Sequence, residues 1–310
     1  MTFPRLNRRQ LLGASLAIGV PAWASSPRPQ VVASFSILAD LVRQVGGNLV
    51  DVVSLVGVDA DAHVFEPTPQ DAMKLQRANV LVTNGLAFEA WMPRLKSASG
   101  FDGHEIVASR GVKARKFSSH AHEEKEHSKG HHHHEDDPHA WQDIRNVVVY
   151  VRNIAEGLAQ ADPSNAAHYQ RRSEAYIQRL EKLDGSIRAT FGGLPKERRV
   201  AVTTHDAFGY YADAYGLRFV PARGLSTESE PSARDIVLLI DQMRKERIQA
   251  VFIENISDPR LMEQLTRETG AVIGGKLYSD ALSGPHGPAS TYLDLMEANT
   301  AALFKAMASR

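Results

Sequence analysis

Short apolar segments alternate with amphipathic segments along this chain, and the alternation occurs twice. The first set runs from Val31 to Val107 and the second from Arg199 to Ala308, with a long amphipathic segment, Ser164 to Thr190, between them. Strands that alternate with helices fold into largely parallel sheets covered by helices. We therefore predict an α/β fold of two lobes with mostly parallel sheets. At ~1.5 Å per residue the segment between them forms a helix of about 40 Å, long enough to join the lobes rigidly.

The expected elements follow from periodicity and from proline and glycine at segment ends. We predict strands at 31–35, 49–56, 79–83, 105–107, 199–204, 217–220, 250–254 and 271–278. Helices are expected at 37–45, 69–78, 88–97, 143–160, 164–190, 207–215, 231–247, 259–269 and 291–308. These elements divide the chain into an N-terminal lobe (25–162), a linking helix (163–190) and a C-terminal lobe (191–310).

The first 24 residues are typical of an export signal. Arg8 and Arg9 precede a short apolar run, Leu11 to Val20, and Ala22-Trp23-Ala24 is a small-x-small cleavage site. The run is too short to span a bilayer comfortably. The paired arginines suggest the twin-arginine export route. Without a cysteine for lipid attachment, we expect residues 1–24 to be a signal peptide and the mature protein to be free in a periplasm.

Composition limits the possible chemistry. The 310 residues include no cysteine, so disulfides and thiolate metal sites are impossible. The formal net charge is zero, which gives no indication of a nucleic-acid partner. Residues 117–138 contain seven of the 13 histidines, with six acidic residues and two lysines. This segment cannot bury enough apolar surface to order itself, so it predicts a mobile, metal-binding His-rich loop.

Four further residues are candidate metal ligands. In open α/β sheets, ligands bind beyond the carboxyl ends of strands. His63 follows the strand at 49–56, His205 follows the strand at 199–204, and Asp280 follows the strand at 271–278. His139 lies between the His-rich loop and the next helix, where it could fold over the same cleft. Imidazole nitrogen and carboxylate oxygen suit Zn2+, and four such groups complete a tetrahedron.

Each candidate also has an ordinary structural interpretation. His63 is equally compatible with a surface loop, and His205 with a capping or core histidine. Asp280 is placed to cap the following turn, and His139 to end the acidic segment. Glu66 is a possible substitute ligand or supporting partner. The helical His-Glu-x-x-His arrangement of zinc proteases is absent.

Five segments together resemble the zinc-binding periplasmic component of high-affinity zinc ABC importers, within the wider group of manganese- and zinc-binding solute receptors. They occur in the order of that family and span nearly the whole mature chain. The segments are Asp61-Ala62-His63-Val64-Phe65-Glu66-Pro67, Asp137-Pro138-His139-Ala140-Trp141, Thr204-His205-Asp206-Ala207-Phe208-Gly209-Tyr210, Ser226-Thr227-Glu228-Ser229-Glu230-Pro231-Ser232 and Tyr278-Ser279-Asp280-Ala281-Leu282-Ser283.

The resemblance implies a metal site in the cleft between two α/β lobes. The histidine ligands of the family fall on His63, His139 and His205, and its C-terminal carboxylate falls on Asp280, with Glu66 or water as competitors for the fourth position. Three imidazoles favour Zn2+ over Mn2+. The implied function is Zn2+ capture and delivery to a membrane permease of an ABC importer, by a monomer that is not an enzyme. The alternatives are a manganese receptor of the same family, a periplasmic metal buffer based on the His-rich loop, and a zinc hydrolase.

Overall fold

The computed structural model describes residues 28–116, 136–224, 227 and 230–309. The predicted signal peptide (1–24) and nearly all of the predicted His-rich loop (117–138) lie outside these residues. Within the described ranges, no helix is long and apolar enough to cross a bilayer.

The N-terminal lobe contains a four-stranded sheet in the order β2-β1-β3-β4, and every neighbouring pair is parallel. The two central strands are almost entirely buried, since helices cover the sheet. The elements are β1 (Gln30–Phe35), α1 (Ser36–Gly46), β2 (Asp51–Val56), α2 (Pro69–Gln76), β3 (Val80–Thr83), α3 (Met92–Ser99) and β4 (His104–Val107).

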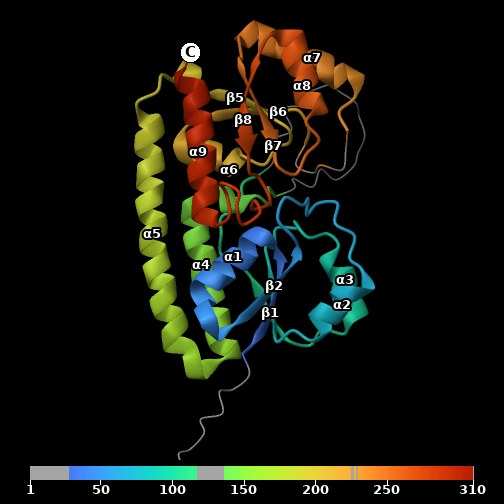
Figure 1. Cartoon of the computed structure of the whole chain (residues 1–310), viewed down its shortest axis with the longest axis vertical. Coiled ribbons are helices and arrows are strands. Elements are labelled where there is room, and N and C mark those ends of the chain that lie inside the picture. Colours follow the sequence, from blue (N-terminus) through green and yellow to red (C-terminus); the bar gives the residue numbers. More distant parts are fainter. Residues whose placement is uncertain (1–27, 117–135, 225–226, 228–229, 310) are drawn as a thin grey trace, which may run out of the picture.

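The C-terminal lobe repeats this design, with a four-stranded parallel sheet in the order β6-β5-β7-β8. Because every strand of a sheet runs in the same direction, all its carboxyl ends lie at one edge, and in both sheets this edge faces the junction of the lobes (Figure 1). The elements are β5 (Val200–Thr203), α6 (Gly209–Tyr215), β6 (Arg218–Pro221), α7 (Ala233–Glu246), β7 (Ala250–Glu254), α8 (Arg260–Thr269), β8 (Val272–Leu277) and α9 (Tyr292–Ala308).

Two helices follow the N-terminal lobe, α4 (Ile144–Ala161) and the 27-residue α5 (Ala166–Gly192). In Figure 1, α5 runs along one side of both lobes, beside α4 in the lower half and beside α9 in the upper half. The α/β fold class with two parallel sheets and one long joining helix is thus confirmed. The exact domain boundaries remain a prediction.

Local sequence signals explain where several helices begin. Capping boxes open α2, α7 and α9, because Thr68, Ser232 and Thr291 each exchange hydrogen bonds with an aspartate three residues later. The largest displacement is that of the helix predicted at 88–97. It spans Met92–Ser99, because Pro93 is tolerated only in the first turn of a helix and would lie in the interior of one that began at Phe88.

One hydrophobic core extends through both lobes. It includes Phe35 and Trp141 from the N-terminal side, Leu180 from α5, and Phe252 and Tyr292 from the C-terminal side. Dispersion and apolar burial therefore couple the lobes directly.

Buried hydrogen bonds reinforce this junction. The indole nitrogen of Trp141 donates to the carbonyl of Ser279 at 2.8 Å, and the hydroxyl of Tyr292 donates to the carbonyl of Trp141 at 2.7 Å. The backbone nitrogen of Tyr292 also donates to Asp40 on α1 at 2.8 Å. These bonds hold the two halves of the chain in one arrangement.

The shared core predicts that the protein unfolds in one transition. Replacing fully buried Leu180 with alanine leaves a cavity and should lower the free energy of unfolding by about 2–5 kcal/mol. The matched control, exposed Glu181→Ala on the same helix, should change it by less than about 0.5 kcal/mol. Differential scanning calorimetry would contradict the coupling if two transitions appeared and Leu180→Ala moved only one of them.

Candidate metal centre

Two loops from each lobe converge at the junction between the sheets. His63 lies in the loop between β2 and α2, and His139 immediately precedes the short 3-10 turn Ala140–Gln142 that leads to α4. His205 comes two residues after the end of β5, and Asp280 three residues after the end of β8. The structure therefore brings together the four residues predicted as ligands.

The four side chains meet through atoms that can bind a metal. The Nε2 atoms of His63 and His139 are 3.3 Å apart. Oδ2 of Asp280 lies 3.2 Å from Nε2 of His63 and 3.1 Å from Nε2 of His205. Oδ1 of Asp280 lies 3.7 Å from Nε2 of His139. Two ligands at the usual zinc distances in a tetrahedron are about 3.3 Å apart, so these spacings fit such an ion closely.

Two further carboxylates contact the opposite sides of the imidazole rings. Oδ1 of Asp137 lies 2.9 Å from Nδ1 of His139 and also accepts the backbone N–H of His139. Oε2 of Glu254 lies 2.6 Å from Nδ1 of His205, while Oε1 accepts the backbone N–H groups of Thr204 and His205. A carboxylate behind Nδ1 favours a proton there and leaves Nε2 free to face an ion.

The charges of the cluster are strongly coupled. Burial raises the pKa of Asp280, but His205 and His139 outweigh it and hold that pKa well below its usual value. Burial also disfavours a charged His205, yet Glu254 and Asp280 outweigh it and hold the pKa of His205 well above its ordinary value. At neutral pH without a metal, both ring nitrogens of His205 are therefore protonated, and the positive charge of the ring balances the buried carboxylates.

Several of these atoms are buried without a properly aligned hydrogen bond among the described residues. Three of them face the centre, namely Nε2 of His205 and both oxygens of Asp280, and two face each other behind the ring, namely Nδ1 of His205 and Oε2 of Glu254. Buried polar groups normally have partners. A divalent cation at the centre would supply one partner to all three atoms, so the donor set fits a metal ion.

Aromatic side chains surround the N-terminal half of the cluster. The ring of Phe88 lies 4.9 Å from that of His63, and the ring of Trp141 lies 5.3 Å from that of His139, measured between centroids. Such a wall restricts water and strengthens the electrostatic interactions inside it.

Glu66 takes no part in this cluster. Its side chain is exposed, whereas Asp280 is fully buried among the histidines. The turn-capping interpretation of Asp280 also lacks support, because neither of its oxygens accepts a backbone N–H among the described residues.

Glu254 was not singled out from the sequence, although a signal for it exists. It is the last residue of β7, which lies between β5 and β8 in the sheet. The same argument about carboxyl ends of strands that selected His205 and Asp280 applies to it.

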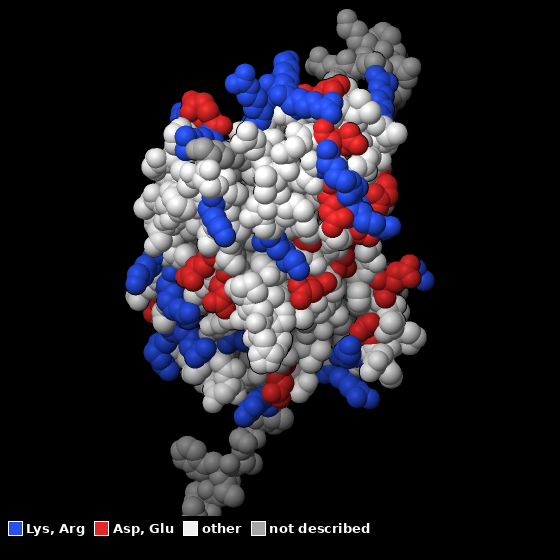
Figure 2. Space-filling view, turned by 45° about the horizontal axis from the view of Figure 1, so that its top comes forward, with Lys and Arg blue, Asp and Glu red and all other residues white. Residues whose placement is uncertain are grey.

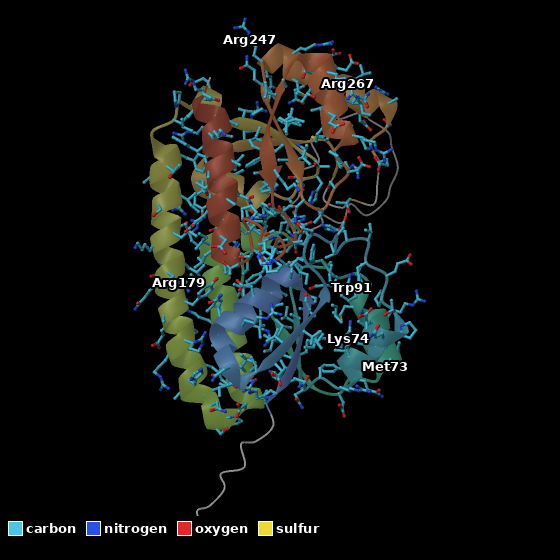
Figure 3. All side chains as sticks on the ribbon, viewed as in Figure 1. Met73, Lys74, Trp91, Arg179, Arg247 and Arg267 are labelled. Carbon is cyan, nitrogen blue, oxygen red and sulfur yellow. The ribbon has the colours of Figure 1, made fainter. Side chains whose placement is uncertain are left out.

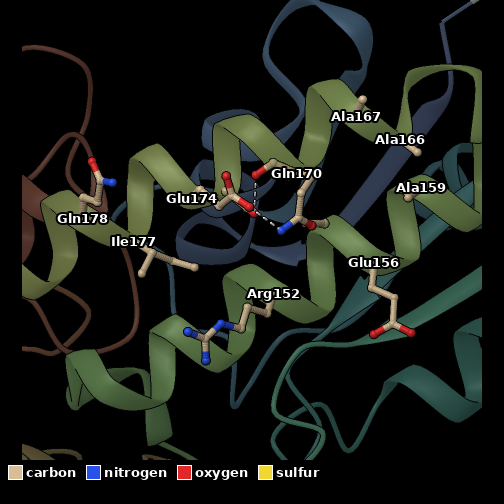
Figure 4. Close-up of a pocket in the computed structure, with 11 residues that line it drawn as sticks. Arg152, Glu156, Ala159, Ala166, Ala167, Gln170, Glu174, Ile177 and Gln178 are labelled. Carbon is tan, nitrogen blue, oxygen red and sulfur yellow. Dashed lines mark hydrogen bonds between the residues drawn. The ribbon is translucent and has the colours of Figure 1, made fainter.

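A surface groove lies elsewhere among the described residues. A groove of about 900 Å³ runs between α4 and α5, bordered by Arg152, Glu156, Gln170 and Glu174, and none of the four clustered residues lines it (Figure 4). Basic and acidic side chains are interspersed on the face drawn in Figure 2, rather than gathered by sign.

Comparison with known proteins identifies the family. Residues 31–306 match the family model described as zinc-uptake complex component A periplasmic. The chain is 30% identical over 284 residues to the metal ABC transporter substrate-binding lipoprotein SsaB of Streptococcus sanguinis, covering 90% of this chain and 89% of that protein. It is 32% identical over 267 residues to the iron-binding protein YfeA of Yersinia pestis, covering 86% and 82%.

Solved structures agree with this result. The periplasmic zinc binding protein TroA of Treponema pallidum superposes with a TM-score of 0.82 at 30% identity, covering 91% of this chain and 99% of that one. The Mn-bound periplasmic metal binding protein of Candidatus Liberibacter asiaticus gives 0.78 at 28% identity, covering 90% and 100%. Both structures therefore match this chain over about nine tenths of its length. The chain therefore belongs to the family of zinc-uptake complex component A periplasmic proteins, which are substrate-binding receptors of metal importers and not enzymes.

Proposed function

We propose that this protein captures Zn2+ in the periplasm and delivers it to the membrane permease of an ABC importer. His63, His139, His205 and Asp280 are the proposed ligands. The observation that carries the proposal is the convergence of four ligand atoms, two from each lobe, all within 4.8 Å of one another, with three of the four side chains fully buried.

The choice of zinc rests on the donor set. Three imidazoles and one carboxylate form a softer set than the oxygen-rich sites preferred by manganese, and zinc binds such sites more tightly than manganese. Relatives of this chain are named for zinc, manganese and iron, so the donor set is the main support for zinc. Four protein ligands also fill the tetrahedron and leave no open position for a catalytic water, which argues against a zinc hydrolase.

The location follows the family. The family description and the Treponema relative are periplasmic, and several Streptococcus relatives are lipoproteins. This sequence contains no cysteine for lipid attachment. We therefore propose a free periplasmic protein, with residues 1–24 as its signal and the twin-arginine route as a further hypothesis.

Removal of one ligand should abolish tight binding. Changes to outer partners of metal ligands already cost about 10–100-fold in affinity, so His205→Ala or Asp280→Asn should weaken zinc binding at least a hundredfold. The control is His286→Ala, an exposed histidine outside the cluster, which should bind like the wild type. Competitive titration with a zinc-responsive dye measures these affinities. Unchanged tight binding by His205→Ala would place the binder elsewhere, as the metal-buffer alternative requires.

Zinc binding should release protons near neutral pH. His205 carries a proton below its raised pKa, and the ion must displace that proton, so the affinity should fall as the pH falls. Isothermal titration calorimetry in buffers of different ionisation enthalpy counts the protons released. Glu254→Gln removes the main charge that raises the pKa of His205, so this variant should release fewer protons. Equal release by both proteins would contradict this account of the site.

Zinc should displace manganese from the protein. The order of stabilities for nitrogen and oxygen ligands places Zn2+ well above Mn2+. We expect an equimolar amount of zinc to remove bound manganese almost completely, as followed by the electron paramagnetic resonance signal of released Mn2+. Retention of manganese under these conditions would favour the manganese-receptor alternative.

A further inference from the structure

The cluster comes closest to solvent at one of its four ligands. The side chain of His63 is 8% exposed, whereas those of His139, His205 and Asp280 are 0% exposed. His63 ends the segment of residues 57–63, here named the His63 loop, which follows β2. An ion that enters or leaves the cluster by the shortest route therefore passes this loop.

The His63 loop is bonded to the opposite lobe through Asp59. The backbone nitrogen of Asp59 donates to the carbonyl of Leu282 at 2.9 Å. Its carboxylate accepts the side-chain amide of Asn255 at 3.0 Å and the backbone nitrogen of Gly284 at 3.3 Å. Asp59 has a φ of 50°, an unusual angle for a residue other than glycine. The cross-lobe contacts hold it there.

A second bond lies closer to the histidine. One oxygen of Asp61 accepts the backbone N–H of His63 at 2.9 Å, and the other accepts the hydroxyl of Thr227 from the C-terminal lobe at 2.5 Å. The indole of Trp91, which lies beside α3 in Figure 3, donates to the carbonyl of Ala62 at 2.9 Å. The loop is thus held by its own lobe at Ala62 and by the other lobe at Asp59 and Asp61.

The bonds of the Asp59 carboxylate are exposed, unlike the buried bonds of Trp141 and Tyr292 described above. Breaking the bonds of Asp59 exposes little apolar surface, since its side chain and its bond to Asn255 are already at the surface. Segments with few buried apolar contacts open at low free energy while the rest of the fold stays intact. The His63 loop can therefore open without separation of the lobes.

We propose that Asp59 and Asn255 form a clasp that controls how fast the bound ion leaves. This rests on the proposed function of the cluster as a metal site. Both are positioning residues. Asn255 directly follows Glu254, the partner of His205, so the clasp joins the His63 loop to the strand end that supports a second ligand. With the clasp closed, His63 is kept against Asp280, and with it open, His63 swings away and releases one ligand.

The test compares rates of zinc dissociation into excess chelator by stopped flow. Asp59→Gly removes the carboxylate and also suits the positive φ, so backbone strain does not confuse the result. Asn255→Ala removes the donor of this contact, together with a second bond from the same amide nitrogen to the carbonyl of Ala281 at 3.2 Å. Each variant should release zinc about three- to tenfold faster than the wild type, as expected for the net loss of one ordinary hydrogen bond at the surface. In the double variant the two rate increases should not multiply, because both substitutions remove the same contact between Asp59 and Asn255.

Other measurements separate the clasp from a general structural role. Asp59→Asn keeps an acceptor for Asn255 but loses the one for Gly284, so its rate should be intermediate. The association rate and the melting temperature of the metal-free protein should stay at wild-type values. Asp102→Asn, an exposed acid on the N-terminal lobe, is the matched control and should change nothing.

The outcomes are distinguishable. If wild-type protein binds no zinc at one equivalent, the proposed function fails. If the wild type binds zinc but Asp59→Gly and Asn255→Ala release it at the wild-type rate, the clasp is refuted while the metal site stands. Parallel losses of melting temperature and association rate would also overturn the clasp, because they would show a structural role only.

Discussion

A buried carboxylate between three imidazoles governs the chemistry of this protein. Asp280 is fully removed from water, and a buried negative charge is costly unless a positive charge lies beside it. In the metal-free protein the proton on His205 supplies that charge, as the directions of both pKa shifts indicate. A divalent cation supplies it better, because it contacts all the ligand atoms at once. The proton on His205 and a bound metal ion can therefore replace one another as the positive charge that compensates Asp280.

The fold brings the ligands around Asp280 by using the same arrangement, a parallel sheet with ligand-bearing loops at its carboxyl edge, in both lobes. Each parallel sheet directs the carboxyl ends of its strands toward the junction, and short loops there carry the ligands. Asp137 and Glu254 then fix the orientation of two rings from behind. The common core and α5 keep the lobes at a constant separation, so atoms supplied by different lobes stay within a few tenths of an ångström of what an ion needs.

Local patterns predicted the architecture well, since alternation and capping residues act over a few positions. His205 and Asp280 could be inferred from strand ends alone. His139 follows no strand, so its candidacy rested on its position beside the His-rich loop and on the resemblance to a family. Glu66 and Asp280 could not be ranked from the sequence, because burial decides between them. The bond between Asp59 and Asn255 joins residues 196 positions apart, and no local pattern reports such a contact.

The bond between Asp40 and Tyr292 has a consequence for how the chain acquires its structure. These residues are 252 positions apart, and the bond from Leu282 to Ser36 closes a loop nearly as long. Contacts of such high sequence separation form late and slow the folding reaction. The first sheet cannot complete its packing until the last helix has been synthesised, so a nascent chain stays incompletely folded until the ribosome has nearly finished with it.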